Sequence, residues 1–237
     1  MTEARQNASI RILFWMALGS AVLPFVAVHV AFWLSANTGH VPWCFPYIDS
    51  CTSISATGRH APGSFVFQGL MLPSAMLMLV LWVFHAHALA AFGAPRVRSR
   101  ALAVLGVAAC VGLALYVTVL GEIGDLWRLQ RKIGTVLFFS FTFLAQLLMA
   151  ATLRETDEQS APGAGTTGQR MLRVCQLMLF IGIVSVGINI ASEDLHDRVE
   201  DAVEWQLAFL LQLNFLLLAL FWRKSNWTLV FERAGNR

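Results

Sequence analysis

Residues 66–120 read VFQGLMLPSAMLMLVLWVFHAHALAAFGAPRVRSRALAVLGVAACVGLALYVTVL, which is two apolar runs, 66–92 and 101–120, around a short basic segment. A helix needs roughly 20 mostly apolar residues to cross about 30 Å of hydrocarbon. Both runs meet that length, and the short basic connection makes them antiparallel neighbours. This stretch predicts a helical membrane protein.

The rest of the chain follows the same pattern. Further apolar runs of suitable length lie at 11–35, 133–153, 171–191 and 204–222. Hydrophobic residues make up 57% of the 237 and charged residues 13%, which is too apolar for an ordinary soluble domain. We therefore predict an all-α integral membrane protein. It is a six-transmembrane helix bundle forming one domain over 1–237, with its longest loop at 36–65.

The basic residues predict the orientation of the bundle. If the N-terminus is cytoplasmic, the inner segments hold 12 of the 17 Lys and Arg residues. The positive-inside rule then places both termini in the cytoplasm. The net charge of +3 comes mostly from the predicted cytoplasmic face, where it would attract anionic lipids. We therefore expect membrane lipids and no nucleic acid as partners. Lysine is scarce beside Arg and Ala, which favours a bacterial inner (plasma) membrane.

Cysteines and small residues indicate packing. Cys44 and Cys51 lie in the outer loop, which would face an oxidising compartment, so a disulfide is preferred over two free thiols. Cys110 and Cys175 lie inside spans and are interpreted as small apolar packing residues. Small residues also predict close helix packing in the third and fifth spans, around Gly106 and Gly112 and around Gly182 and Gly187.

Polar residues gather at the predicted outer ends of the spans. On one continuous helix, Asn189, Glu193, His196 and Glu200 would share a face. The neighbouring outer turn supplies basic residues. These are Arg128, Arg131 and Lys132. Ionisable residues near the membrane core are costly, so they tend to pair or to serve a function.

Three interpretations of these polar residues remain open. The first is an ion-paired outer rim. The second is a headgroup site, in which the basic residues lie near the start of the fourth span, where free N–H groups and the helix dipole favour an anion. The third is a metal or acid–base site using Glu193, His196 and Asp197, which would need three ligands and an open position. No His-x-x-x-His pattern accompanies them, so we predict no metal and no cofactor.

Two further segments are ISATGRHAPGSFVFQGLML, 54–72, and AVEWQLAFLLQLNFLLLAL, 202–220. Both resemble the Frag/DRAM/Sfk superfamily, which includes the damage-regulated autophagy modulators and the post-GPI-attachment lipid-remodelling factor. The matching residues are Ile54, Ser55, Thr57, Gly58, Pro62, Phe67, Glu204, Trp205, Ala208 and Phe209. One departure is Ile133, which stands before Gly134 where many relatives carry His. The resemblance implies six spans and a role in membrane lipid organisation.

The predicted function is binding of lipid headgroups at the outer face, which modulates lipid remodelling or transbilayer organisation. The headgroup contacts are expected from Ser55, Thr57, Arg128, Arg131 and Lys132. The polar wall around them, or the catalytic group if there is one, is expected from Asn189, Glu193, His196, Asp197 and Glu204.

Two other functions stay open at this point. An intramembrane lipid hydrolase or acyltransferase would use His196 as base, Glu193 or Asp197 to orient it, and Ser55 as nucleophile. A small-molecule transporter would need a midplane site and repeat symmetry, and only the helix breaks expected at Pro24 and Pro73 favour it. The sequence also leaves open a membrane-protein partner or a homo-oligomer.

Overall fold

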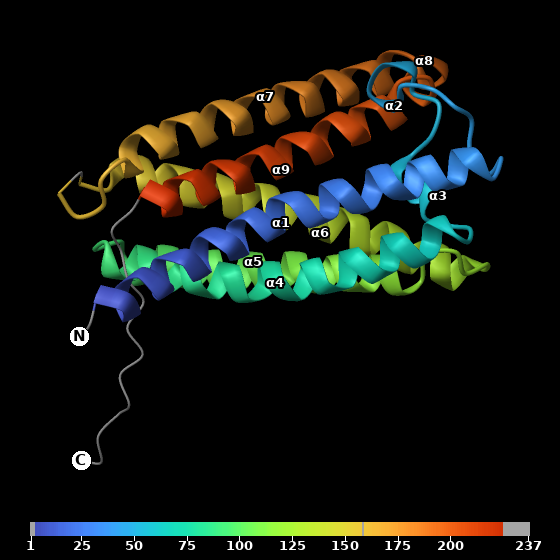
Figure 1. Ribbon diagram of the computed structural model, residues 1–237. Helices are drawn as coiled ribbons and strands as arrows, with labels where there is room; N and C mark the ends of the chain where they lie inside the picture. Colours follow the sequence, from blue (N-terminus) through green and yellow to red (C-terminus); the bar gives the residue numbers. More distant parts are fainter. Residues whose placement is uncertain (1–2, 158, 225–237) are drawn as a thin grey trace.

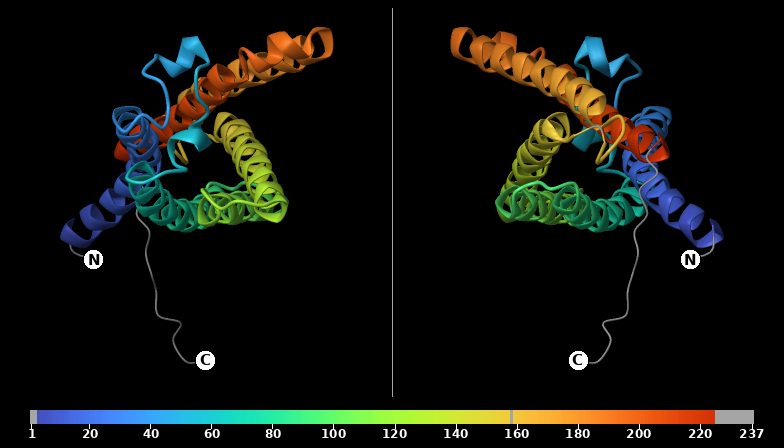
Figure 2. Two further views of the ribbon diagram at one scale, coloured as in Figure 1. Left: turned by 90° about the vertical axis from the view of Figure 1, so that its right-hand side faces the viewer. Right: turned by 90° about the vertical axis from the view of Figure 1, so that its left-hand side faces the viewer.

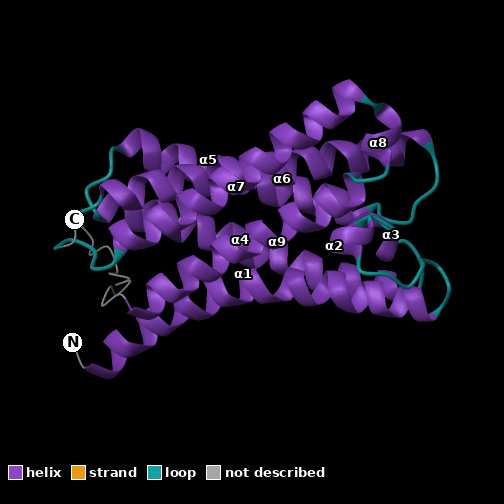
Figure 3. Cartoon of the chain, turned by 90° about the horizontal axis from the view of Figure 1, so that it is seen from above, coloured by secondary structure: helices purple, strands orange, loops and turns teal. Residues whose placement is uncertain are grey.

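The computed structural model describes residues 3–157 and 159–224, and in these residues it contains helices and loops but no strand (Figure 3). Six of the helices are long and apolar enough to cross a membrane, which confirms the predicted all-α, six-span plan. The long helices are α1 (Glu3–Asn37), α4 (Gly63–Ala91), α5 (Arg96–Thr118), α6 (Asp125–Glu155), α7 (Ala164–Ala191) and α9 (Glu200–Lys224). The short ones are α2 (Pro46–Asp49), α3 (Ile54–Thr57) and α8 (Glu193–Asp197).

The long helices run alongside one another, so the molecule has two distinct ends (Figure 1). The terminal end is where α1 begins and α9 ends, together with the connection 92–95 and the described residues 156–157 and 159–163. The loop end carries the long loop 38–62 with α2 and α3, the turn 119–124, and α8. The cytoplasmic placement of the terminal end stays a prediction.

Close backbone contact joins α5 to α6. A Cβ atom added to Gly134 would lie 2.7 Å from both the carbonyl oxygen of Gly112 and the backbone nitrogen of Tyr116. Gly112 and Gly134 are both buried. Small residues let helix backbones approach in a membrane, where lipid removes the hydrophobic drive between helices. The predicted packing role of the third span's small residues is therefore confirmed for Gly112.

Helix α7 packs differently from the other spans. Only 11% of its most apolar window is buried, against 39–50% in the other five spans. Its buried residues all lie in the terminal-end part, between Ala164 and Met178. A Cβ atom at Gly182 or Gly187 would meet nothing within 4 Å, so the packing predicted for these two glycines is wrong within this chain. The end-on views show α7 projecting outward from the other spans (Figure 2).

A side chain of α9 compensates for the proline in α1. Pro24 lacks the N–H that would bond the carbonyl of Ser20, one turn earlier. When the amide of Gln212 is oriented with its nitrogen toward α1, it donates to Ser20 O at 2.9 Å and to Ala21 O at 3.3 Å. The opposite orientation would set oxygen against oxygen, which is why this one is assigned. A backbone acceptor freed inside a span thus has a partner, as a lipid environment requires.

Candidate functional site

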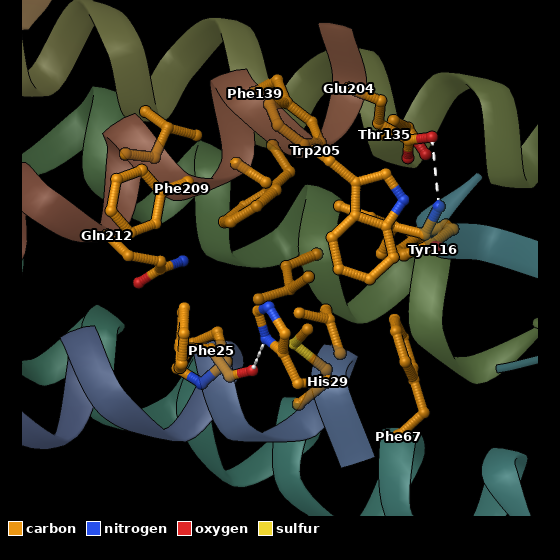
Figure 4. Close-up of a pocket in the computed structure, with 18 of the residues that line it drawn as sticks. Phe25, His29, Phe67, Tyr116, Thr135, Phe139, Glu204, Trp205, Phe209 and Gln212 are labelled. Carbon is orange, nitrogen blue, oxygen red and sulfur yellow. Dashed lines mark hydrogen bonds between the residues drawn. The ribbon is translucent and has the colours of Figure 1, made fainter. Parts of the chain in front are cut away.

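A cavity lies inside the loop-end half of the bundle, between α1, α4, α5, α6 and α9 (Figure 4). The cavity is narrow: the space inside it that can hold the centre of a water molecule is about 40 Å³, and all the space free of protein atoms, including the open mouth, is about 610 Å³. Most of its wall is apolar, from side chains such as Phe25, Phe67, Met71, Leu113, Phe138, Phe139 and Phe209. The polar members of the wall are His29, Tyr47, Tyr116, Thr135, Glu204 and Gln212. Sequence reasoning predicted only Glu204 among them.

The first turns of α9 hold the long loop over this cavity through four hydrogen bonds, and we call this contact the loop clamp. The bonds are Ala202 N to Ser50 Oγ (3.1 Å), Trp205 Nε1 to Thr52 O (2.9 Å), Ile54 N to Glu204 Oε2 (3.3 Å) and Gln206 Nε2 to Tyr47 O (2.9 Å). In Figure 4, the dashed line nearest the Glu204 label marks the bond from Ile54 N to Glu204. Because three of the four α9 groups are side chains, the sequence of this turn fixes where the loop sits.

Tyr47 ties the loop to α1 as well. Its hydroxyl lies 3.0 Å from His29 Nε2, and His29 Nδ1 lies 2.7 Å from the carbonyl oxygen of Phe25. Because a carbonyl can only accept, Nδ1 donates to it, and with a neutral ring Nε2 accepts from the tyrosine. Burial raises the pKa of Tyr47 to about 12, so its phenol keeps the proton that it donates.

The short helix α3 places the two predicted hydroxyl residues differently. Thr57 is fully buried, and its hydroxyl donates to Ile54 O at 2.7 Å. The predicted headgroup contact of Thr57 is therefore wrong, because no ligand at the surface can reach it. Ser55 is partly exposed, and its Oγ accepts from Arg59 Nη2 at 3.1 Å.

The three predicted headgroup cations lie in the first turns of α6. Arg131 Nη1 donates to Val119 O at 3.1 Å and to Glu122 O at 2.7 Å, so this side chain caps the end of α5. Arg128 pairs with Asp125 at 3.2 Å on the surface, and Lys132 is exposed. The helix begins at Asp125, well before the predicted span. The expectation that Arg131 and Lys132 lie beside free N–H groups is therefore wrong.

The predicted acidic face is not one helical face. Helix α7 ends at Ala191, Ser192 is extended with φ −162° and ψ 111°, and α8 begins after it. Asn189 thus lies on α7, while Glu193, His196 and Asp197 lie on α8, and none of these four lines the cavity. The prediction that they share one helical face with Glu200 is wrong, because the helix breaks at Ser192. His196 Nε2 instead lies 3.7 Å from Glu200 Oε2.

The catalytic alternative finds no support in this geometry. In the described part of the chain, no hydrogen bond joins His196 to Ser55, whose hydroxyl is bonded to Arg59 and lies 3.1 Å from Ser53 Oγ. Nucleophilic catalysis by a hydroxyl needs a base within hydrogen-bond reach. Within 3–157 and 159–224, no three His, Cys, Asp or Glu side chains gather where a metal ion could bind.

The cysteines pair as predicted. Cys44 and Cys51 form a disulfide in the long loop, which is confirmed, and the ring that it closes contains Tyr47 and Ser50 of the loop clamp. Cys110 and Cys175 are free and buried inside the bundle, which agrees with their predicted packing role.

These features define a six-span integral membrane protein in which a clamped loop covers an apolar cavity. The sequence profile described as Frag1/DRAM/Sfk1/Cwh43P N-terminal domain matches residues 12–223. The match covers nearly the whole chain, so the protein belongs to this family, as its motifs predicted. No curated protein and no solved structure gives a significant match. The two motif segments, 54–72 and 202–220, meet in the loop clamp.

Proposed function

We propose that the protein binds a membrane lipid, with an acyl chain in the apolar cavity and the headgroup at the loop end. By this binding it would modulate lipid remodelling or the distribution of lipid between leaflets. The observation that carries the proposal is the apolar wall of this cavity, which has Glu204, Tyr47 and His29 among its few polar groups. Because the cavity is narrow, an acyl chain would enter it by moving side chains of the wall aside. Ligand sites commonly combine an apolar wall with few polar groups that fix orientation.

A second hollow supports access from the bilayer. An open groove of about 930 Å³ lies between α6, α7 and α9, bordered by Ser140, Met178, Gly182 and Leu207. Phe139 borders both this groove and the cavity. The groove exists because the loop-end half of α7 stands away from the bundle (Figure 2). A lipid chain could thus pass laterally from the groove into the cavity once the ring of Phe139 moves.

The predicted headgroup contacts are revised by the geometry. Arg128 and Lys132 point their charges outward and stay in the proposal, and Ser55 stays as a partly exposed hydroxyl. Arg131 is omitted because its guanidinium caps α5. Among the predicted polar wall, Glu204 is retained because it lines the cavity.

The proposed setting is the inner membrane of a bacterium, with the loop end outside. The support is the excess of Lys and Arg in the segments of the terminal end. A disulfide in the long loop agrees with an oxidising compartment on that side.

The test fills the cavity and measures bound lipid. Ala208 lines the cavity, so Ala208→Trp places a large ring in the space proposed for the chain. The matched control is Val136→Trp, because Val136 lies on α6 with 56% of its surface exposed. Lipids extracted from the purified proteins are identified by mass spectrometry. We expect the wild type and Val136→Trp to retain the same lipid and Ala208→Trp to lose most of it.

Two results would contradict the proposal. Equal lipid retention in all three proteins would show that the cavity does not hold the lipid. Conversion of added lipid by the wild type, seen as a new lipid mass, would favour the hydrolase or acyltransferase instead. The headgroup contacts are tested separately by Arg128→Ala with Lys132→Ala, which should change the preference among headgroups while leaving Ala208 and the cavity intact.

A further inference from the structure

We propose a second lipid site, independent of the cavity: the groove between α4 and α5 at the terminal end binds the phosphate of an anionic membrane lipid. The two helices lie side by side there (Figure 1). The groove is about 530 Å³, including open space, and its charged or polar lining is His87, Arg96, Ser99 and Arg100. The remaining lining residues are Ala86, Ala90 and Ala103.

The start of α5 favours an anion. The helix begins at Arg96 after Pro95, and no side chain caps it. The carbonyl of Pro95 accepts from Arg98 N at 2.9 Å and from Ser99 N at 3.3 Å, which closes the first turn. The first N–H groups of a long helix, together with its dipole, attract negative charge.

Two cations stand on the same face of this helix start. Arg96 and Arg100 are four residues apart, and like charges at this spacing repel each other. Both are exposed, and in the described part of the chain neither forms an ion pair. Arg98, on a different face, instead pairs with Glu155 of α6. An anion between Arg96 and Arg100 would be attracted by both side chains, and this attraction would offset the repulsion between them.

A buried hydroxyl in the same groove lacks a partner. Ser99 is only 7% exposed, and its Oγ has no hydrogen bond among the described residues. Leaving a buried polar group unpaired is costly, and such groups in native structures call for an explanation. Ser99 lines the groove together with Arg96 and Arg100, so the proposal pairs its hydroxyl with an oxygen of a phosphate held by the two arginines. This observation is separate from the helix start and points to a ligand.

The shape of the groove favours a lipid over a free phosphate ester. Ala86 and Ala103 lie deeper in the bundle than Arg96, so an apolar surface continues from the cations toward the membrane interior. On α4, His87 lines the groove, and its Nδ1 lies 2.7 Å from Val83 O, so Nε2 is the ring nitrogen not engaged by that bond. A phosphate at the helix end with its glycerol and chains over the alanines matches this arrangement. Basic pockets between spans commonly bind anionic headgroups.

The test counts lipid bound to the purified full chain by native mass spectrometry. The probes are phosphatidylglycerol, zwitterionic phosphatidylcholine and water-soluble glycerol phosphate. The test variant is Arg96→Gln with Arg100→Gln. The control removes the same charge at the terminal end but outside the groove, by Arg154→Gln with Arg173→Gln. Ser99→Ala removes the hydroxyl without changing charge.

We expect phosphatidylglycerol to bind the wild type more tightly than phosphatidylcholine. The test variant should weaken that binding about tenfold, and Ser99→Ala about threefold. The control should bind as the wild type does. Equal weakening in the control would overturn the proposal, because it would show general attraction to a basic face. Glycerol phosphate that binds as tightly as the lipid would overturn the assignment to a lipid. Ala208→Trp should leave this site intact, so failure of the cavity and failure of this groove are distinguishable.

Discussion

The two ends of the bundle are closed by different contacts, and α9 shows the difference along one helix. Near the terminal end, Trp222 is 1% exposed and its Nε1 donates to His85 Nε2 of α4 at 2.9 Å. Near the loop end, Trp205 is also 1% exposed, but its Nε1 donates to Thr52 O of the long loop at 2.9 Å. One tryptophan joins two spans, and the other joins a span to a loop. The loop end therefore depends on a loop for closure.

Helix α7 shows the same difference. At the terminal end, a Cβ atom on Gly168 would lie 2.6 Å from the carbonyl oxygen of Ala150, so α7 and α6 are in backbone contact there. Toward the loop end, Gly182 has open space around it and borders the lateral groove. The bundle is tight where spans contact spans and open where the loop replaces them. The proposed lipid would occupy the space that this openness leaves.

Removing either tryptophan should have the largest effect on stability. Trp205→Ala and Trp222→Ala should each lower the free energy of unfolding by about 3–5 kcal/mol, because each leaves a large void in a packed region. Hydrogen exchange separates the two ends. Trp205→Ala should raise exchange mainly in residues 50–56 of the loop, and Trp222→Ala mainly in the terminal-end part of α4.

Trp15 provides the control for these variants. It is a tryptophan with 61% of its surface exposed, so Trp15→Ala should lower the free energy of unfolding far less. If Trp205→Ala and Trp222→Ala gave the same exchange pattern, the contrast between the two ends would be lost.

Two glycines of α7 provide a smaller and sharper test. Gly168→Ala should destabilise the protein by about 1–3 kcal/mol, because the new methyl group meets backbone that cannot easily move. Gly182→Ala should not destabilise it, since its methyl group meets nothing and alanine favours a helix. Unfolding of the purified variants in a denaturing detergent measures both. A loss at Gly182 as large as that at Gly168 would mean that the loop-end half of α7 is packed after all.

Much of the fold could be predicted because bilayer thickness imposes a simple pattern on sequence. The length of the apolar runs identified all six spans, and the short basic connection after Ala91 made α4 and α5 neighbours. The helix ends were less predictable. The segment with Arg128 and Lys132 is predicted to lie in the outer turn before the span 133–153. In the structure it belongs to α6, which begins at Asp125. Apolar length therefore locates a span without locating its first residue.

The cavity could not be predicted, because its wall is assembled from ordinary apolar residues of five helices. Apolar residues in a span are as typical of a buried core as of a surface that faces lipid. Glu204 could be singled out because it lies in the segment 202–220 that carries the family resemblance. The break at Ser192 did have a signal: a serine followed by acidic residues is typical of a helix start, and its Oγ accepts from Leu195 N at 3.3 Å. Periodicity alone favoured the wrong, continuous helix.

The smallest predicted effect is a pH dependence that belongs to the loop end. The pKa of Tyr47 is raised from 10.0 to about 12 by burial, so above about pH 10 the unfolded chain releases a proton that the folded chain keeps. The contribution of this phenol to stability is complete below about pH 10 and is lost as the pH rises through about 12.

Tyr47→Phe removes that titration together with the bond to His29. The difference in unfolding free energy between wild type and Tyr47→Phe should therefore be largest near pH 9 and should shrink toward pH 12. A difference that stays constant over this range would show that the loop leaves Tyr47 open to water, and the loop clamp would then not close this end of the bundle.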